Sequence, residues 1–135
     1  MNQKNDLLTY RRKRAQETLQ DAKILYRENS LYSAVNRIYY SLFYEVSALL
    51  AAFDLASAKH SGVRAIFNEH FVKTGKVSVE TGKFYSVMFD FRQKSDYGDF
   101  VHFEHDKVQE WILKAERCIK ELEIVLEIEL KKLDE

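Results

Sequence analysis

Apolar residues recur at helical spacing along nearly the whole chain. The first segment ends near residues 29–30 and carries its apolar positions on one face: Ala15, Leu19, Ala22 and Leu25. The last segment begins near residues 104–106 and continues to about Leu133, again with one inward face: Val108, Trp111, Ile112, Ala115, Ile119, Leu122 and Leu126. Both segments are therefore predicted to be amphipathic helices that pack by one face.

Two further helices are predicted in the middle of the chain. One begins at Ser61, which would cap it, and carries apolar residues as far as Phe71 before Gly75 ends it in a left-handed conformation. The next begins after Ser78, which is a good N-cap residue, and should fray near Ser95.

The segment 31–53 is apolar or aromatic almost all round, so we predict a helix in the centre of the core. It nevertheless carries Asn36, Arg37 and Glu45, and a buried charge is costly unless something pairs with it. Residues spaced four apart are predicted to form one narrow polar stripe along this helix: Ser33, Arg37, Ser41 and Glu45. The stripe either closes an internal polar network or lines a cleft.

Composition also favours an all-α fold. The 135 residues include no Pro and only four Gly, while 46% are hydrophobic and 31% are charged, which suits one helical domain over residues 1–135. The single Cys118 excludes an intramolecular disulfide and fits a reducing compartment, so the expected location is the cytoplasm. The polar, basic N-terminus and the charges within residues 31–53 predict neither a secretion signal nor a membrane span.

Charge is balanced overall but unevenly distributed. Residues 1–30 carry seven Lys or Arg and four Asp or Glu, whereas residues 104–135 carry six and ten, so the two ends are expected to pair as neighbouring helices. The basic run 11–14 is open to two interpretations, a nucleic-acid contact or a solvated helix face. We favour the solvated face because no excess of positive charge supports nucleic-acid binding elsewhere.

Three local strings, in this order, resemble the HEPN domain, a small helical nucleotide-binding domain. They are AVNRIYYSLFYEVSALL, KHSGVRAIFNEHFVKTG and FDFRQKSDYGDF. The resemblance extends from about Leu7 to Leu126 and is to the compact stand-alone prokaryotic form. It implies an up-and-down four-helix bundle with one short additional helix, a homodimer, and a minimal nucleotidyltransferase as partner in a toxin–antitoxin-like pair.

Many HEPN proteins are metal-independent ribonucleases in which an Arg is followed, after four to six residues, by a His. The Arg stabilises negative charge on the phosphate and the His moves a proton. Here the Arg would be Arg92, but Tyr97, Gly98 and Asp99 occupy the positions for the His. Only weak catalytic candidates are left: Arg92, Tyr97 and His102. A tyrosine hydroxyl is a poor base at neutral pH, so the resemblance implies a phosphate-binding Arg92 more strongly than it implies catalysis.

Two interpretations of Arg92 remain open. In the first, Arg92 would form an intrahelical ion pair with Asp96, four residues on, and would have a structural role. Alternatively, Arg37 and Arg92 contact the phosphate of a nucleotide or RNA in a cleft, and three further residues orient the ligand or the arginines: Asn36, Asp96 and Tyr97. The aromatic residues nearby fit helix packing and are predicted to be core: Tyr39, Tyr40, Phe43 and Tyr44.

A second anion site is conceivable at His60, where the first backbone N–H groups of the short helix would face a phosphate beside Lys59 and Arg64. Ordinary capping explains the same residues. The spacing of His102 and His105 provides two ligands, which do not make a zinc site, so neither a metal nor a cofactor is expected.

Three functional hypotheses follow. The first is a homodimeric binding module that holds nucleotide or RNA in an Arg37/Arg92 cleft and partners a nucleotidyltransferase. The second is a ribonuclease with a non-standard His or Tyr, and the third is a scaffolding dimer whose polar stripe fixes helix register. Dimerisation would be favoured by apolar residues predicted to be exposed in the last connection: Phe100, Val101 and Phe103.

Overall fold

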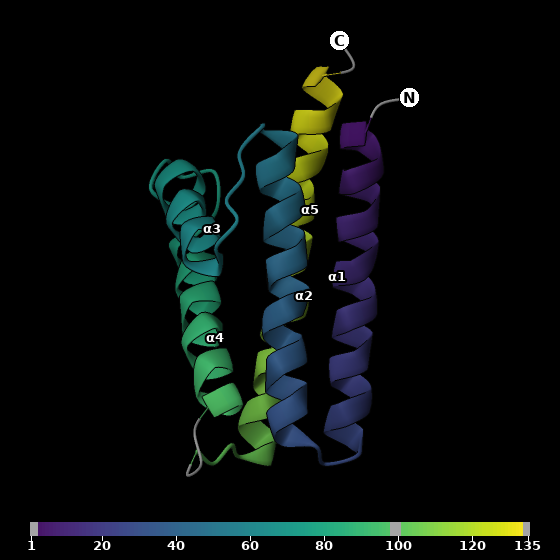
Figure 1. Cartoon of the computed structure of the whole chain (residues 1–135), viewed down its shortest axis with the longest axis vertical. Helices are drawn as coiled ribbons and strands as arrows, with labels where there is room; N and C mark the ends of the chain where they lie inside the picture. Colours follow the sequence, from purple (N-terminus) through teal and green to yellow (C-terminus); the bar gives the residue numbers. More distant parts are fainter. Residues whose placement is uncertain (1–2, 98–100, 134–135) are drawn as a thin grey trace.

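The computed structural model describes residues 3–97 and 101–133 and, within these ranges, the side chains of all residues except 94–97. Its elements are, in chain order, α1 (Gln3–Arg27), α2 (Leu31–Ala52), α3 (His60–Phe67), the π-helical turn η1 (Asn68–Val72), α4 (Val79–Tyr97) and α5 (His105–Leu133). The long helices α1, α2, α4 and α5 run alternately up and down (Figure 1). The predicted all-α bundle with a short additional helix is confirmed.

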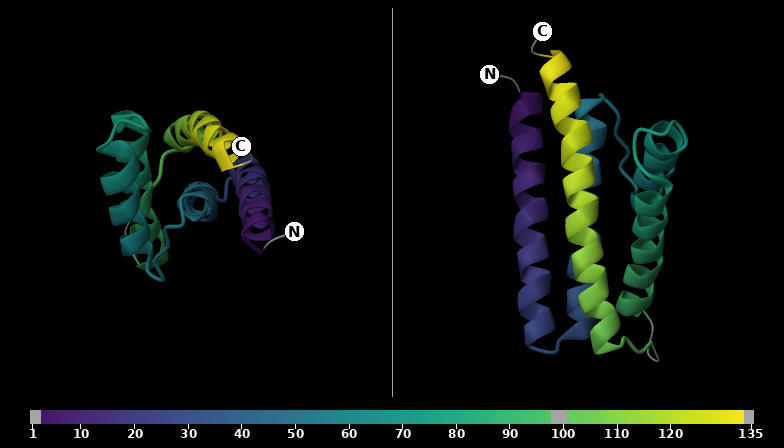
Figure 2. Two further views of the ribbon diagram at one scale, coloured as in Figure 1. Left: turned by 90° about the horizontal axis from the view of Figure 1, so that it is seen from above. Right: turned by 180° about the vertical axis from the view of Figure 1, so that it is seen from behind.

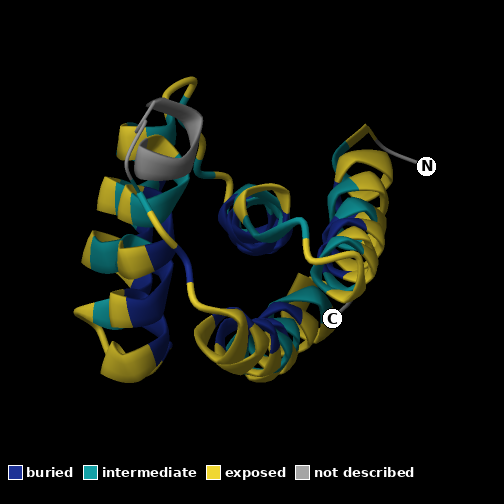
Figure 3. Ribbon diagram, turned by 90° about the horizontal axis from the view of Figure 1, so that it is seen from below, coloured by how far each residue is buried: buried dark blue, intermediate teal, exposed yellow. Residues whose placement is uncertain are grey.

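Helix α2 lies at the centre of the bundle. Seen along the helix axes, α1, α5 and α4 surround it on three sides, while α3 lies beside α4 (Figure 2). None of the described helices covers the side of α2 opposite α5, and the ribbon of α2 there is coloured as intermediate or exposed (Figure 3). The bundle is therefore open along one face of its central helix.

The turns between helices follow from local chemistry. Asn29 has a φ of 59°, and the Ser30 N–H donates to the Leu25 carbonyl oxygen at 2.8 Å, which closes α1 with a left-handed residue. Gly75 has a φ of 82°, as predicted for a left-handed cap. Ser78 caps α4 as predicted, because its Oγ accepts a hydrogen bond from the Thr81 N–H at 3.2 Å.

The predicted cap of the short helix was wrong. The helix begins at His60, its N-cap residue is Lys59, and no side chain caps it. The turn before α3 lies close to the first turn of the helix, since a Cβ on Gly62 would lie 2.0 Å from the Ser57 Oγ. The helix then continues as the π-helical turn η1, closed by a hydrogen bond from the Lys73 N–H to the Asn68 carbonyl oxygen at 2.8 Å.

Ion pairs join α1 to α5, as the uneven charge distribution predicted. The Arg12 guanidinium donates to both carboxylate oxygens of Glu123, at 3.0 and 2.6 Å, and it also contacts Glu127. Lys23 lies 3.1 Å from Glu116. Within the basic run 11–14, Arg11 also donates to the Ser47 carbonyl oxygen at 3.0 Å and Arg14 donates to Glu17 at 3.2 Å, so most of the run is engaged within the protein.

The predicted polar stripe of α2 does not stay on one face. Ser41 is buried and donates to the Ile38 carbonyl oxygen at 2.7 Å, and Glu45 is 1% exposed beside Glu123 and Arg12. Residues four apart drift by roughly 40° around an α-helix, so a stripe that starts at Ser33 has turned by about 120° at Glu45. Glu45 therefore faces α1 and α5, and the prediction of one narrow polar stripe was wrong.

The buried carboxyl group of Glu45 lies beside the half-buried carboxyl group of Glu123. Burial raises the pKa of Glu45, and the neighbouring Glu123 raises it further. Burial also acts to raise the pKa of Glu123, but its hydrogen bonds with Glu45 and Arg12 outweigh this effect and lower it. Glu45 therefore keeps its proton at neutral pH while Glu123 is the carboxylate that pairs with Arg12.

The buried Glu45 predicts that stability falls as pH rises. Above the ordinary pKa of Glu the unfolded chain loses the Glu45 proton while the folded chain keeps it, so the free energy of unfolding decreases between about pH 6 and pH 9. Glu45→Gln keeps a neutral hydrogen-bonding group and should raise the free energy of unfolding at pH 8, by up to about 1.4 kcal/mol for each pH unit above the ordinary pKa of Glu. Urea unfolding followed by circular dichroism checks this, with the exposed Glu69→Gln as control. A pH slope that Glu45→Gln leaves unchanged would contradict the assignment.

Candidate functional site

Two arginines from different helices converge on one tyrosine at the open face of α2. The Arg37 guanidinium carbon lies 4.9 Å from the centre of the Tyr40 ring, and that of Arg92, from α4, lies 5.9 Å from the same ring. The Asn36 side-chain oxygen accepts hydrogen bonds from Nε and Nη2 of Arg37, at 3.0 and 2.5 Å. The structure thus brings together three of the residues proposed from the sequence.

His60 lies beside this pair and comes from a third element. Its Nδ1 forms a hydrogen bond of 2.8 Å with the Tyr39 hydroxyl, and its ring stacks on Phe43 with 4.2 Å between centroids. Burial lowers the pKa of His60, and the positive charge of Arg92 lowers it further. The imidazole is therefore neutral at pH 7.

Tyr39 forms the buried wall behind the arginines. Burial raises the pKa of Tyr39 to about 12, although the neighbouring Tyr85 hydroxyl and the charge of Arg92 both oppose that rise. The Arg92 guanidinium carbon lies 5.2 Å from the Tyr39 ring. Tyr39 therefore stays a neutral phenol that positions Arg92 and His60.

The open face extends across α2 to α1. The Arg14 guanidinium carbon lies 5.2 Å from the Tyr44 ring, and its Nη1 donates to Glu17 at 3.2 Å. We call the surface made by Arg14, Tyr44, Tyr40, Arg37 and Arg92 the arginine–tyrosine face.

Sequence reasoning assigned Tyr40, Phe43 and Tyr44 to the core, but each is only half-buried. In a helix that is apolar all round, the residue pattern does not reveal which side is left uncovered. Arg14 was not predicted as a site residue because it belongs to the basic run 11–14. In that run Arg12 forms ion pairs with α5, whereas Arg14 lies on the arginine–tyrosine face. The spacing of Arg37, Tyr40 and Tyr44, three and four residues apart, is the sequence feature that could have placed them on one face of the helix.

Several predicted site residues are not brought together. Arg64 lies over the Phe89 ring at 4.0 Å and 3.6 Å from Asp90, so it packs against α4 and does not complete an anion site at the start of α3. The side chains of Asp96 and Tyr97 lie outside the described residues.

The two histidines after α4 have other surroundings. His102 is exposed in the connection to α5, whereas His105 forms a 3.0 Å hydrogen bond with the Tyr26 hydroxyl and stacks on its ring. His105 therefore fastens the start of α5 to α1.

The predicted exposure of Phe103 was wrong. Phe103 is 4% exposed, and its ring packs against Tyr32, Phe91 and Trp111. Val101 is half-buried, and Phe100 lies outside the described residues. Phe103 therefore closes the core between α2, α4 and α5 and does not argue for dimerisation.

The arrangement on the open face suits a phosphate with an attached base. A guanidinium is a planar set of donors that matches phosphate oxygens, and it stays charged at every physiological pH. Tyrosine rings that are half-exposed offer faces on which a base can stack. Among the described residues, no group of three or more His, Cys, Asp or Glu side chains is placed to hold a metal ion.

Comparison with known proteins settles the family. The profile described as HEPN domain matches residues 8–131. The chain belongs to the HEPN family. A "UPF0332 protein" of Thermotoga maritima is 54% identical over 127 residues, which cover 94% of this chain and 96% of that protein.

Two archaeal relatives carry names that mention toxins. "Putative toxin MJ0142" of Methanocaldococcus jannaschii is 33% identical over 71% of this HEPN chain and 65% of its own length. "Putative toxin MJ0605" of the same organism is 40% identical over 62% of each chain.

Of the helices that the structure describes, none combines the length and apolar character that a membrane span requires.

The electrostatic contact between Arg92 and His60 can be measured. Removing the positive charge with Arg92→Gln should raise the pKa of His60, although burial keeps it below its ordinary value. A titration of the His60 ring protons by NMR checks this, with Arg117→Gln on α5 as the matched control. An equal response to both substitutions would place His60 outside the field of Arg92.

Proposed function

We propose that this HEPN protein binds the phosphate groups of a nucleotide or single-stranded RNA on the arginine–tyrosine face. The observation that carries the proposal is the convergence of Arg37 and Arg92 on the Tyr40 ring, at 4.9 and 5.9 Å. Two positive charges that contact the same ring repel each other, and an anion held between them would turn this repulsion into attraction. Phosphate oxygens would accept from both guanidinium groups while Tyr40 or Tyr44 stacks on a base.

We further propose that the protein acts as the toxin-like member of a toxin–antitoxin-like pair, with a minimal nucleotidyltransferase as its partner. The names of the two archaeal relatives support the first part, and the HEPN resemblance supports the second. We also expect a cytoplasmic homodimer. The buried Cys118, a free thiol, fits a reducing compartment.

The binding proposal predicts a loss of RNA affinity when either arginine is removed. Arg37→Ala and Arg92→Ala should each weaken binding of a fluorescent single-stranded RNA by about tenfold at low salt, because each removes a charge-assisted phosphate contact. Each variant should also reduce the slope of log affinity against log salt by about 0.7. Arg117→Ala, on α5, is the matched control. Fluorescence anisotropy that shows equal affinities for all four proteins would reject the site.

A second candidate function, metal-independent cleavage of RNA, is favoured by one observation. The sequence lacks a His at the expected spacing after Arg92, but His60 of α3 lies near Arg92 in space. Burial and the charge of Arg92 both lower the pKa of His60. A neutral imidazole can accept the proton of a 2′-hydroxyl while arginine stabilises the charged phosphate. This arrangement differs from the ribonuclease hypothesis drawn from the sequence, in which His102 and Tyr97 were only weak candidates.

The cleavage candidate predicts that His60→Gln and Arg92→Ala both lower the rate by about a hundredfold or more in the presence of EDTA. His102→Gln and His70→Gln serve as controls and should leave the rate unchanged. Gel analysis of a labelled RNA over time checks this. Binding without cleavage by the unaltered protein would exclude the candidate and leave the binding proposal intact.

A further inference from the structure

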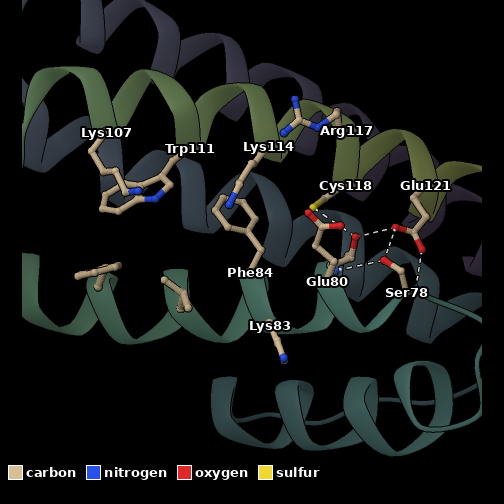
Figure 4. Close-up of a pocket in the computed structure, with 13 residues that line it drawn as sticks. Ser78, Glu80, Lys83, Phe84, Lys107, Trp111, Lys114, Arg117, Cys118 and Glu121 are labelled. Atoms are coloured by element: carbon tan, nitrogen blue, oxygen red, sulfur yellow. Dashed lines mark hydrogen bonds between the residues drawn. The ribbon is translucent and has the colours of Figure 1, made fainter.

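A second surface lies between α4 and α5, away from the open face of α2. A cavity of about 570 Å³ separates the two helices (Figure 4). At one end Thr81 donates to Glu121 at 2.6 Å, and at the other the rings of Phe91 and Trp111 lie 4.9 Å apart. The cavity follows α4 from Ser78 to Phe91, which corresponds to roughly 20 Å at the helical rise per residue. We call it the α4–α5 groove.

The α4–α5 groove has an apolar floor and a basic rim. The floor consists of Phe84, Phe91 and Trp111, and the cations of the rim are Lys83, Lys107, Lys114 and Arg117. Two carboxylates also line the groove, Glu80 and Glu121, of which Glu121 is held by the Ser78 and Thr81 hydrogen bonds. The rim therefore carries more positive than negative charge.

The basic rim is only weakly neutralised by its surroundings. Lys107 and Lys114 share the neighbouring Glu110, at 3.3 and 3.9 Å, in ion pairs that are open to solvent. Exposed pairs of this kind contribute little free energy. A stronger acidic partner can replace them.

A second hollow lies on the other side of α4. It measures about 400 Å³, and it shares Lys83 and Val87 with the α4–α5 groove. Val79 and Val87, two turns apart on α4, are 59% and 41% exposed. Between them, a Cβ on Gly82 would lie 2.8 Å from the Val72 Cγ2, so only a residue without a side chain lets η1 pack this closely. Val79 and Val87 thus form an apolar ridge, with Lys83 between them and a hollow on each side.

We propose that this ridge and its two hollows dock an amphipathic helix with acidic flanks from a partner protein. A helix laid along α4 would place apolar side chains in both hollows and carboxylates beside the rim cations, as in other helix-in-groove complexes. The length of roughly 20 Å corresponds to three to four helical turns. The inference rests on the proposed association with a partner protein and states where that partner binds. It does not depend on nucleotide binding.

Two other occupants fit the surface less well. A second copy facing the same groove would bring two basic rims together, which opposes association. A nucleic acid would find little ring surface, because Trp111 and Phe84 are each 7% exposed and the Lys114 Nζ lies 5.8 Å from the Phe84 ring centre.

The test uses two synthetic helical peptides of about 20 residues that share one apolar face. One carries Glu and the other Lys on both flanks, and fluorescence anisotropy measures their binding to the full chain. The Glu-flanked peptide should bind about tenfold more tightly than the Lys-flanked one. Val87→Asp should weaken this binding about tenfold, and Lys107→Glu with Lys114→Glu should reverse the preference. Leu113→Asp, at an exposed apolar position of α5 outside the groove, is the matched control.

Several outcomes would overturn the inference. Binding by neither peptide would do so, as would equal weakening of binding by Val87→Asp and Leu113→Asp. Displacement of the bound peptide by single-stranded RNA would indicate a nucleic-acid site. A Val87→Asp change that alters only the self-association of the protein would indicate a second copy as the occupant. Arg37→Ala and Arg92→Ala should leave peptide binding unchanged, and Val87→Asp should leave RNA binding unchanged. Failure of the groove and failure of the arginine–tyrosine face are therefore separate results.

Discussion

The packing of α2 on three sides is the constraint on which the rest of the structure depends. Helices α1, α4 and α5 bury most of its side chains, including Ile38, Leu42 and Leu49, and none covers the fourth side. A bundle closed on all sides would have to bury Arg37, at a cost that few partners could offset. Because the fourth side is open, the same helix is both the centre of the core and the floor of a surface site.

Charge on α2 is handled in two opposite ways. Glu45, on the closed side, keeps its proton and adjoins the Arg12–Glu123 pair, which ties α1 to α5. Arg37, on the open side, keeps its charge at the surface, where Asn36 and Tyr40 hold it beside Arg92. The first arrangement needs no ligand, whereas the second places two positive charges where an anion can reach them.

The helices could be predicted from the sequence because each carries a clear local signal. Ser78, Gly75 and the one-sided apolar pattern of α5 mark ends and faces that tertiary packing does not change. The π-helical turn η1 and the cap at Lys59 could not be predicted, since they result from the close approach of neighbouring segments. The site was half predictable: the residues Arg37 and Arg92 were identified, but the role of Tyr40 depends on which side of α2 is uncovered.

A double-mutant cycle on RNA affinity tests most directly whether Arg37 and Arg92 act as one phosphate site. Affinities of the unaltered protein, Arg37→Ala, Arg92→Ala and the double variant would be measured at one salt concentration. Two arginines on one phosphate should be coupled, so that the double variant loses at least about 1 kcal/mol less than the sum of the single losses. Strictly additive losses, or no loss in either single variant, would contradict the shared site.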